Sequence, residues 1–560
     1  MNWKKEIAES MKNQLPIDIS LTEIELLLEK PKHEHLGDVA FPCFSLAKQL
    51  RMAPQKIAED LAKRIQSPHI EKVEVVGGYV NLYFHKEKLI SEVLSEIVEK
   101  KSDYGNVQTG NGVITIDLSS PNIAKPFSMG HLRSTVIGNA IAHIAEKNGY
   151  TPFRINHLGD WGTQFGKLIV AYRLWGEEEK VKENPIKELL KLYVLFHERA
   201  ELDPALNDEG RKWFKYLEDG NEEALQLWDW FRTESLKEFQ KIYTLLGITF
   251  DSDHGEAFYN DKMNKVVELL EDKQLLVESD GAKVVELEEF PPCLIKKRDG
   301  STLYATRDLA AAIYRQENYQ FVKSLYVVGN EQTLHFKQLF QVLQKMGYNW
   351  AEGMAHIPFG MMLKDGKKMS TRKGKVVLLE EVLDEAIAMA KQNIEQKNPN
   401  LPNKEEIAKQ VGVGAVLFHD LKNYRSNDVE FSLEDMLKFE GETGPYIQYT
   451  HARACSLLRK GNFVETDDSP SLIWDIESFQ IVKALREFPE YVNKAMEMYD
   501  PSLIAKYLLD LAKVFNKYYA QVRILDNVKE KQARLMTVYA VTIVLKEGLR
   551  LLGINAPSEM

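Results

Sequence analysis

The stretch Val113-Ile114-Thr115-Ile116-Asp117-Leu118 decides the fold class of this chain, because it is short and rich in β-branched residues and is therefore typical of a strand. A loop with two prolines follows it. Residues 134–148 then carry apolar side chains at helical spacing, and Gly149 ends this predicted helix. A second strand is expected at residues 152–156. The order strand, helix, strand predicts a parallel sheet, and hence an α/β domain.

The segments on either side of this unit have different patterns. On the N-terminal side, a helical pattern at 53–61 and two strand patterns at 73–76 and 79–84 predict an α+β domain. On the C-terminal side, strand and helix alternate again over about 294–380, and every strong pattern after about residue 405 is helical. The chain therefore contains more than one kind of domain.

These changes of pattern predict three domains and one insertion. The segment from about 167 to 290 is acidic and carries tryptophans, and we expect it to be a helical insertion. A length of 560 residues is also too great for a single core. The predicted division is an N-terminal domain at 1–110, an α/β domain at 111–420 that contains the insertion, and an all-helical C-terminal domain at 421–560.

Composition excludes some classes of protein and leaves the partner open. No run reaches about 18 apolar residues, so no membrane span is indicated, and the first residues lack the apolar core of a secretory signal. Cys43, Cys293 and Cys455 are too far apart to suggest a disulfide framework or a zinc site. We therefore expect a cytoplasmic protein with no resident metal. The net charge of −11 alone argues against nucleic-acid binding, but a local basic surface is sufficient for it.

Two segments are typical of phosphate binding. Ser128-Met129-Gly130-His131 lies between the first strand and its helix, where doubly wound folds bind phosphates at a helix N-terminus. The run from Lys364 to Lys375 holds six cations, one anion, two glycines and two hydroxyl residues. Taken singly, each has an ordinary alternative: a structural helix start in the first case and a solvated basic loop in the second.

Together these segments resemble the two signatures of the class I arginyl-tRNA synthetases. The sequence from Ser120 to Thr135 is similar to the region of their HIGH signature, and Lys368-Met369-Ser370-Thr371-Arg372 stands where their KMSKS signature lies. Further similar motifs occur at 156–164, 304–308 and 444–449, and the last residues 556–560 resemble the C-terminus of the family. The resemblance therefore covers essentially the whole chain.

Two departures from the family pattern bear on the chemistry. Ser128 replaces the first histidine of the HIGH signature, and Thr371 replaces the second lysine of the KMSKS signature. That lysine is expected to meet the ATP phosphates. Lys125 could supply the missing charge, and Lys373 is the alternative.

The resemblance implies a Rossmann-type catalytic domain that condenses arginine with ATP and magnesium. Pyrophosphate then leaves, and the arginyl group passes from the adenylate to the terminal ribose of an arginine tRNA. The implied catalytic residues are Lys125, His131, Lys368 and Ser370. The implied ATP-binding residues are Ser128, Gly130, His131, Lys368, Met369 and Ser370.

The resemblance also implies contacts with the amino acid and the tRNA. Ser120 and Asn122 match positions that meet the α-ammonium group. Asp308 would pair with the guanidinium, with Tyr304 and Gln332 beside it; a carboxylate suits the two parallel donors of that group. The positions that match tRNA contacts are Tyr79 and Asn81 for the D-loop and Tyr446, Tyr518 and Met560 for the anticodon region.

Alternatives stay open at this point. Asp308 could be a helix cap or a partner of Arg307, and tyrosines at helical spacing are often core residues. The chain could also be another enzyme with the same two signatures, such as a synthetase for a different amino acid or a nucleotidylyltransferase. A further alternative is a tRNA-binding paralogue without catalysis, which the presence of His131, Lys368 and Ser370 disfavours. We expect a monomer that binds no membrane.

Overall fold

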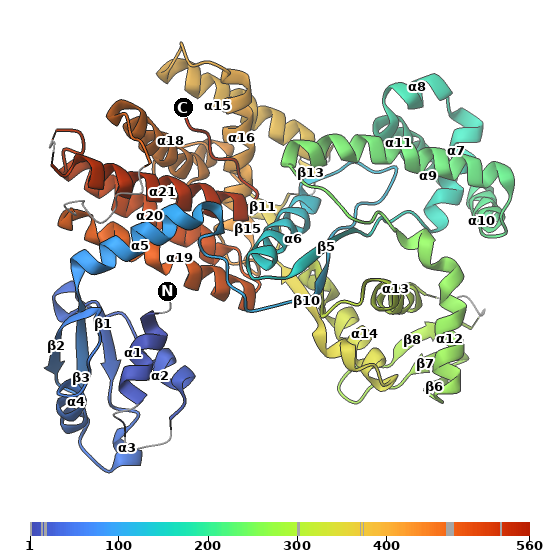
Figure 1. Ribbon diagram of the computed structural model, residues 1–560. Helices are drawn as coiled ribbons and strands as arrows, with labels where there is room; N and C mark the ends of the chain where they lie inside the picture. The colour runs from blue at the N-terminus through green and yellow to red at the C-terminus, as the bar shows by residue number, and fades with distance from the viewer. Residues whose placement is uncertain are drawn as a thin grey trace. The chain divides into compact units, whose positions relative to one another are not determined.

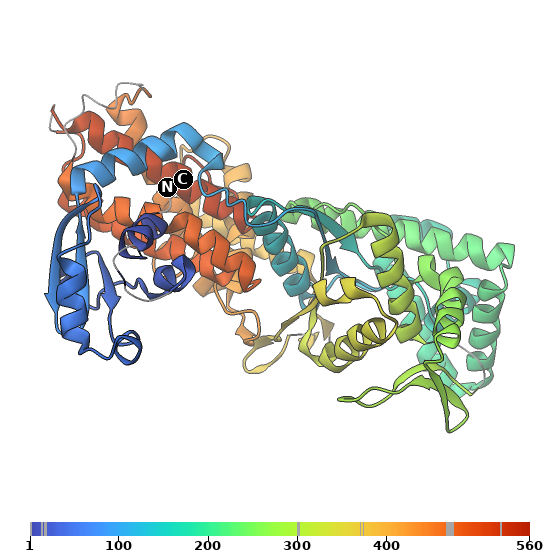
Figure 2. The same cartoon turned by 60° about the horizontal axis from the view of Figure 1, so that its bottom comes forward.

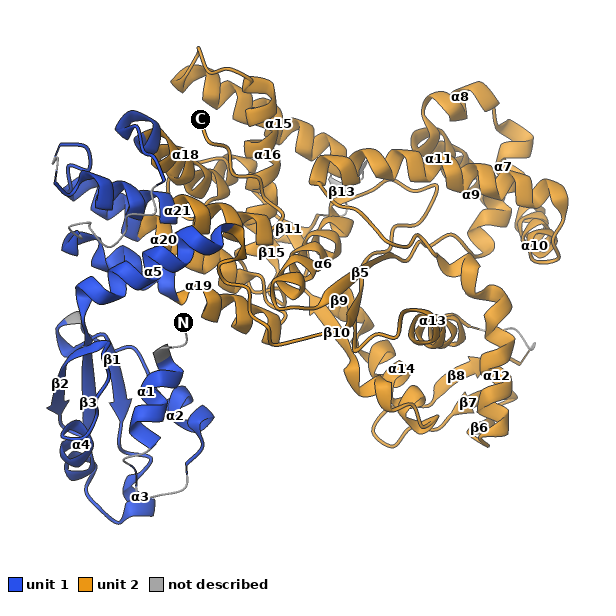
Figure 3. Cartoon of the chain, in the orientation of Figure 1, with its two compact units in different colours: residues 1–101, 457–486, 514–540 blue, residues 102–456, 487–513, 541–560 orange. Residues whose placement is uncertain are grey.

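The structure is a computed structural model that describes residues 3–12, 15, 19–298, 303–369, 371–372, 375–465, 475–526 and 529–560. The chain divides into two compact units (Figure 3). The first consists of residues 1–101, 457–486 and 514–540, and the second of residues 102–456, 487–513 and 541–560. The helical C-terminal part of the chain is thus divided between the two units.

The first unit contains a small antiparallel sheet with strand order β1-β3-β2. The strands are β1 (Val39–Pro42), β2 (Ile70–Val76) and β3 (Tyr79–Phe84), and the helices are α1 (Trp3–Lys12), α2 (Leu21–Leu27), α3 (Ala47–Leu50), α4 (Pro54–Ala62) and α5 (Lys86–Lys100). Val80, Leu82 and Phe84 are buried on one face of the central strand. The predicted α+β character of the N-terminal region is confirmed.

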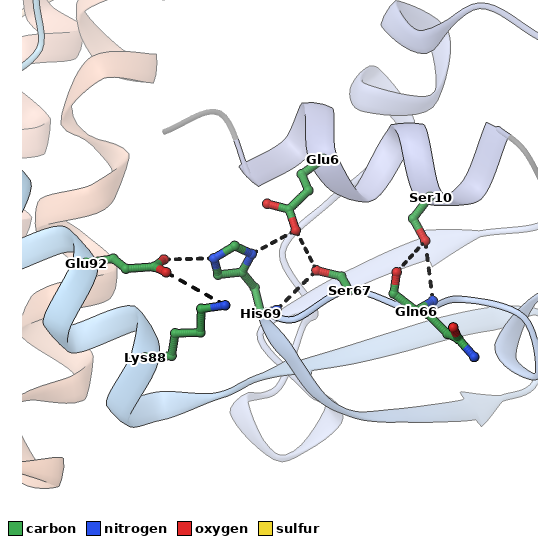
Figure 4. Close-up of polar contacts among 7 residues, drawn as sticks. All are labelled: Glu6, Ser10, Gln66, Ser67, His69, Lys88 and Glu92. Carbon is green, nitrogen blue, oxygen red and sulfur yellow. Dashed lines mark hydrogen bonds and ion pairs between the residues drawn. The ribbon is translucent and has the colours of Figure 1, made fainter.

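His69 cross-links α1 to α5 in this unit (Figure 4). Its Nδ1 lies 2.8 Å from Oε1 of Glu6, and its Nε2 lies 2.8 Å from Oε2 of Glu92. The Ser67 hydroxyl donates to the same oxygen of Glu6 at 2.8 Å. These bonds hold the N-terminal helix against the rest of the unit. A helix of ten residues is only marginally stable by itself, so such tertiary contacts stabilise it.

The second unit is built on a four-stranded parallel sheet with strand order β10-β9-β4-β5. Its two edge strands, β10 and β5, are labelled in Figure 1. The strands are β4 (Val113–Ser119), β5 (Thr151–Asn156), β9 (Lys323–Gly329) and β10 (Met354–Phe359). Helix α6 (Met129–Lys147) joins β4 to β5, and α14 (Thr333–Lys345) joins β9 to β10. From β4 and β9 the chain moves outward in opposite directions, so a topological switch point lies between them. In open parallel sheets, ligands bind at the carboxyl ends of the strands beside such a point.

Helix α6 lies close to β4 and is anchored to a second helix. A Cβ atom on Gly138 would collide with Leu118, so only glycine allows this approach. Arg133 is buried and donates through Nε to Oδ1 of Asp420 at 2.8 Å, at the end of α16 (Lys404–Leu421). Its Nη1 also donates to the carbonyl of Asn427 at 2.8 Å. These contacts fix the helix that begins at the first signature.

The insertion in the second unit is helical only in its first part. Its helices are α7 (Thr163–Trp175), α8 (Glu178–Glu183), α9 (Pro185–Leu202), α10 (Ala205–Glu218) and α11 (Glu222–Leu246), which form one group in Figures 1 and 2. The segment η3 (Glu256–Lys262), α12 (Met263–Asp272), β6 (Leu276–Ser279), β7 (Ala282–Val285), β8 (Cys293–Lys296) and α13 (Tyr304–Tyr319) then leads to β9.

The strands β6 and β7 correct the expectation of helix throughout 167–290. They form an antiparallel hairpin whose turn residues, Asp280 and Gly281, both have positive φ. An Asp-Gly pair favours this hairpin turn, because both residues tolerate the left-handed conformation.

The remaining elements follow the sheet and close the chain. Around the second signature the strands are β11 (Met362–Lys364), β12 (Lys367–Lys368), β13 (Thr371–Arg372) and β14 (Lys375–Val376). The elements that follow include α15 (Leu379–Lys397), β15 (Val429–Glu430) and α17 (Leu433–Met436). The two-residue strand β15 pairs with β11. The last helices are α18 (Gly444–Gly461), α19 (Phe479–Glu497), α20 (Ser502–Gln521) and α21 (Lys531–Leu551). Within the described ranges, no helix is long and apolar enough to cross a membrane.

Candidate active site

A cavity of about 520 Å³ opens at the carboxyl ends of β4, β5 and β9. The five side chains predicted to bind the amino acid are all among its lining residues: Ser120, Asn122, Tyr304, Asp308 and Gln332. They come from the loop after β4, from the first two turns of α13 and from the turn after β9. The fold thus brings together residues that are up to 212 positions apart in the sequence.

Asp308 is held between two imidazoles. Its Oδ2 lies 2.7 Å from Nε2 of His335, and its Oδ1 lies 3.9 Å from Nε2 of His157. Burial alone would raise the pKa of Asp308, but the hydrogen bond from His335 and the nearby positive charges hold this pKa below its ordinary value. The carboxyl is therefore ionised at neutral pH, and its side chain is still 27% exposed to the cavity.

Arg315 and Asp117, which both line the cavity, form a buried ion pair. Nη2 of Arg315 lies 2.9 Å from Oδ2 of Asp117 and 3.4 Å from Nδ1 of His157. Burial alone would lower the pKa of Arg315, but the Asp117 carboxylate raises it above its ordinary value. The guanidinium of Arg315 and the carboxylate of Asp117 therefore offset each other.

Glu256 and Arg307 form a second pair on the cavity wall, with Nη1 and Oε2 3.4 Å apart. Burial raises the pKa of Glu256 to about 7, although Arg307 opposes this shift. Among the described residues that line the cavity, Asp308 is then the carboxylate without a lysine or arginine partner. The cavity is suited to a ligand that carries one cationic group at its inner end.

The loop after β4 is fixed by the loop after β5. Asn122 and Gly159 pair as a parallel bridge, and the Gly159 N–H donates to the carbonyl of Pro121 at 3.0 Å. A Cβ atom on Gly159 would strike the Asn122 side chain, so glycine is required for this approach. The backbone N–H of Ala124, a residue with positive φ, donates to Ser235 of α11 at 2.9 Å.

Ser128 and His131 form the start of α6. The backbone N–H of Ser128 donates to Nδ1 of His131 at 3.1 Å. Since Nδ1 is the acceptor, the proton of the neutral ring is on Nε2. Burial lowers the pKa of His131, and the charge of Lys125 lowers it further. His131 is therefore a neutral donor beside the positive end of the helix dipole, an arrangement suited to phosphate oxygens.

Lys125 precedes the first signature in the sequence, and its side chain reaches helix α9 of the insertion. Its Nζ is 5.8 Å from the centre of the Tyr193 ring on α9, within the range of a cation–π contact. Burial is the main cause that lowers the pKa values of both His131 and His197, and the charge of Lys125 contributes to each shift. The ammonium group is thus near the helix start where a phosphate would bind.

The segment that follows the second signature is joined to the start of α6 by backbone hydrogen bonds. The N–H of Met129 donates to the carbonyl of Val377 at 3.3 Å, and the N–H of Leu379 donates to the carbonyl of Phe127 at 3.0 Å. Lys368, in β12, is exposed. Met369 is buried instead of exposed to a ligand, and its N–H donates to the carbonyl of Met362 at 2.8 Å. Ser370 and the alternative cation Lys373 lie outside the described residues.

The residues predicted to bind tRNA occupy different surroundings. Tyr79 is half-buried on β3, whereas Asn81 on the same strand is buried. Tyr446 and Met560 are half-buried. Tyr518 is only 5% exposed, and its hydroxyl donates to Asp475. A contact between RNA and Tyr518 would therefore require this ring to become exposed first.

Sequence reasoning missed several residues of the cavity. Arg315 lies seven residues after Asp308, and His335 lies three residues after Gln332, so helical spacing could have placed each near a residue that was identified. Glu256 and His157 carry no such signal, because they come from segments outside the motifs that were assigned to the amino acid.

The sheet, the helix start and the cavity at the switch point define a nucleotide-binding protein of the Rossmann type. Three family models match the chain: "tRNA synthetases class I (R), catalytic domain" at residues 93–433, "DALR anticodon binding domain" at 447–560, and "Arginyl tRNA synthetase N terminal domain" at 1–84. The chain belongs to the class I arginyl-tRNA synthetase family.

Similar proteins cover the whole chain. It is 60% identical over 563 aligned residues to the arginine–tRNA ligases of an Exiguobacterium strain and of Enterococcus faecalis, with 100% of each chain covered. Among solved structures, the arginyl-tRNA synthetase of Thermus thermophilus is 27% identical with a TM-score of 0.82, and the match covers 100% of this chain and 99% of that one.

Proposed function

We propose that the chain is an arginine–tRNA ligase that forms arginyl adenylate from arginine and ATP and then transfers arginine to the 3′-terminal ribose of its tRNA. The observation that carries the proposal is the cavity in which Asp308 is ionised and, among the residues that the structure describes, contacts imidazoles and no lysine or arginine. A guanidinium supplies two parallel donors for the two oxygens of such a carboxylate. Tyr304 and Gln332 bound this end, and Ser120 and Asn122 stand where the α-ammonium would lie.

The ATP side of the proposal uses the start of α6. The arginine carboxylate attacks the α-phosphorus, the bond to the bridging oxygen breaks, and pyrophosphate leaves. Ser128, the backbone at Gly130, and Nε2 of His131 would receive the α-phosphate, and Lys125 and Lys368 would offset the charge that develops on its oxygens. Met369 and Ser370 are assigned to ATP binding as members of the second signature. Magnesium would enter with ATP as part of this substrate.

The tRNA side extends the proposal to the other domains. We assign D-loop contact to Tyr79 and Asn81, and anticodon contact to Tyr446, Tyr518 and Met560. The division into a domain at 1–110, a catalytic domain at 111–420 and a helical domain at 421–560 belongs to the same proposal. So do a monomeric state and a cytoplasmic location.

Arginine-dependent exchange between ATP and pyrophosphate, measured with arginine tRNA present, tests the proposal. Arginine should support exchange, and lysine and citrulline should not, because lysine offers only a point charge and citrulline offers no charge. Exchange with a different amino acid would assign the chain another substrate. Binding of arginine tRNA with no exchange for any amino acid would make it a tRNA-binding protein without catalysis.

A further inference from the structure

The carboxylate of Asp308 is oriented from both of its oxygens before any ligand arrives. His335 approaches Oδ2 from the first turn of α14, and His157 approaches Oδ1 from the loop after β5. His335 is itself confined: its side chain is 10% exposed, and its ring lies 4.9 Å from that of Tyr304 and 5.2 Å from that of Phe336. The ring therefore has little freedom to turn away from Asp308.

The imidazole of His157 is held by Arg315, and Arg315 is held by Asp117 of the sheet. Arg315 can only donate, so Nδ1 of His157 is the acceptor in this contact, and Nε2 of His157 is the ring nitrogen that faces Asp308. Asp117 on β4 holds Arg315 in turn at 2.9 Å. The order of contacts is Asp117, Arg315, His157, Asp308 and His335, and all five residues line the cavity.

Discrimination between a guanidinium and an ammonium depends on the plane of the carboxylate, because both cations are attracted by its charge. Two parallel N–H···O bonds form only when the two planar groups are aligned, whereas an ammonium can bond to either oxygen from many directions. A carboxylate that rotates freely would therefore lose affinity for arginine and keep much of its affinity for lysine.

We propose that His335, together with the Asp117–Arg315–His157 chain, positions the Asp308 carboxylate in the plane that a guanidinium requires, and that this positioning separates arginine from lysine. The inference rests on the proposed function and assigns His335 a positioning role. His335 donates to the oxygen of Asp308 and leaves a lone pair of each oxygen free for the ligand.

The test compares His335→Gln with His335→Phe. Glutamine keeps an N–H donor, and phenylalanine keeps a flat ring of similar size without one. Removal of a hydrogen bond to a charged group predicts that His335→Phe raises the KM for arginine about ten- to a hundredfold. It should leave kcat at saturating arginine within about threefold. The inhibition constant of lysine, measured as a competitor, should change much less, and His335→Gln should restore the KM for arginine.

Three outcomes decide the inference. An unchanged KM for arginine in His335→Phe overturns it. Equal losses in both variants, or equal losses for arginine and lysine, would show that His335 only supports the fold. If the phenylalanine variant does not fold, His335→Asn, whose amide is too short to reach Asp308, replaces it in the same comparison. Asp308→Asn separates the two proposals: if that variant loses arginine affinity and His335→Phe does not, only the inference fails.

Discussion

At the scale of single residues, the arginines that line the cavity pair with two of its three carboxyl groups. Arg315 offsets Asp117, and Arg307 faces Glu256, so the carboxylate of Asp308 is left to meet the ligand. Its ionisation is secured by the imidazole contacts, because burial alone would favour the protonated form. One carboxylate of fixed charge is what a substrate with one side-chain cation requires.

Replacing Asp308 with asparagine keeps the shape of this side chain and removes its charge. We expect kcat/KM for arginine to fall by an amount equivalent to about 2–5 kcal/mol, the range for truncating one partner of a buried charge pair. Steady-state aminoacylation kinetics measures this loss. If the variant stays within about threefold of the parent, Asp308 does not hold the guanidinium.

Glu256 should make arginine binding depend on pH. Its pKa is raised to about 7, so the carboxyl is mostly neutral at pH 6 and mostly ionised at pH 8. Arginine carries positive charge and favours the ionised form, so its affinity should rise as pH increases from 6 to 8. The same shift means that stability falls as pH rises through 7, because a buried carboxylate must then ionise. Calorimetric titration with arginine between pH 6 and pH 8 measures this change in affinity. If the affinity of Glu256→Gln does not vary with pH, Glu256 is the titrating group. If it still varies with pH in Glu256→Gln, the assignment is contradicted.

Lys125 should compensate for the lysine that Thr371 replaces. Lys125→Ala should slow adenylate formation by about ten- to a thousandfold, equivalent to roughly 1.4–4 kcal/mol, while the fold survives. Lys167→Ala is the matched control, since this lysine also lies over an aromatic ring of α9, at 5.9 Å from Phe196. Single-turnover measurements that give the same rate for Lys125→Ala and the parent would move the role to Lys373.

Single residues differ in how far the sequence could identify them. Asp308 was found because it lies in a motif shared with a known family, whereas His335 was not, since its role depends on a neighbour 27 residues away. Tyr518 shows a second limit: a motif match selects the position but does not predict that its side chain is buried. Contacts between distant segments are what the sequence pattern lacks.

At the scale of elements, the start of α6 contains the first signature and bonds to the segment that follows the second signature. The periodicity of apolar residues predicted a helix from residue 134, but the structure begins it at Met129, because Ser128 and His131 cap its first turn with polar groups. Polar capping residues are invisible to an apolar pattern. The strands, by contrast, were predicted to within one residue at 113–118 and 152–156, since β-branched runs mark them directly.

The Arg133–Asp420 pair should be essential to this arrangement. Asp420→Asn leaves the buried guanidinium without its counter-charge, and we expect a loss of about 3–5 kcal/mol in the free energy of unfolding. Urea denaturation followed by tryptophan fluorescence measures it. Asp435→Asn, which breaks an exposed pair with Lys438, is the control and should change little. Equal stability of the two variants would show that α6 is held by its apolar contacts alone.

At the scale of the whole molecule, the predicted tRNA contacts are divided between the two units, because Tyr446 and Met560 belong to the same unit as the amino-acid cavity. The cavity belongs to the second unit, and Tyr79, Asn81 and Tyr518 belong to the first. The sequence predicted the α/β, α+β and helical parts, because each has its own periodicity. It could not predict that the helical part is shared between the units, since this depends on long-range contacts.

A dependence on tRNA is expected at this scale. With ATP and arginine alone, we expect negligible exchange of pyrophosphate, and addition of arginine tRNA should restore it, as members of this family generally need bound tRNA to activate the amino acid. The exchange assay with and without tRNA measures this directly. Full exchange in the absence of tRNA would contradict the expectation.

The paired charges of the cavity also restrict which small molecules could block it. A neutral mimic of arginine would enclose the Asp308 carboxylate with only its imidazole neighbours, His335 and His157, and without a guanidinium, which is costly in a partly buried site. A competitive inhibitor must therefore bring its own cation. A permanent cation, however, crosses a lipid bilayer poorly. The electrostatics that select the amino acid thus protect this cavity from membrane-permeant drugs.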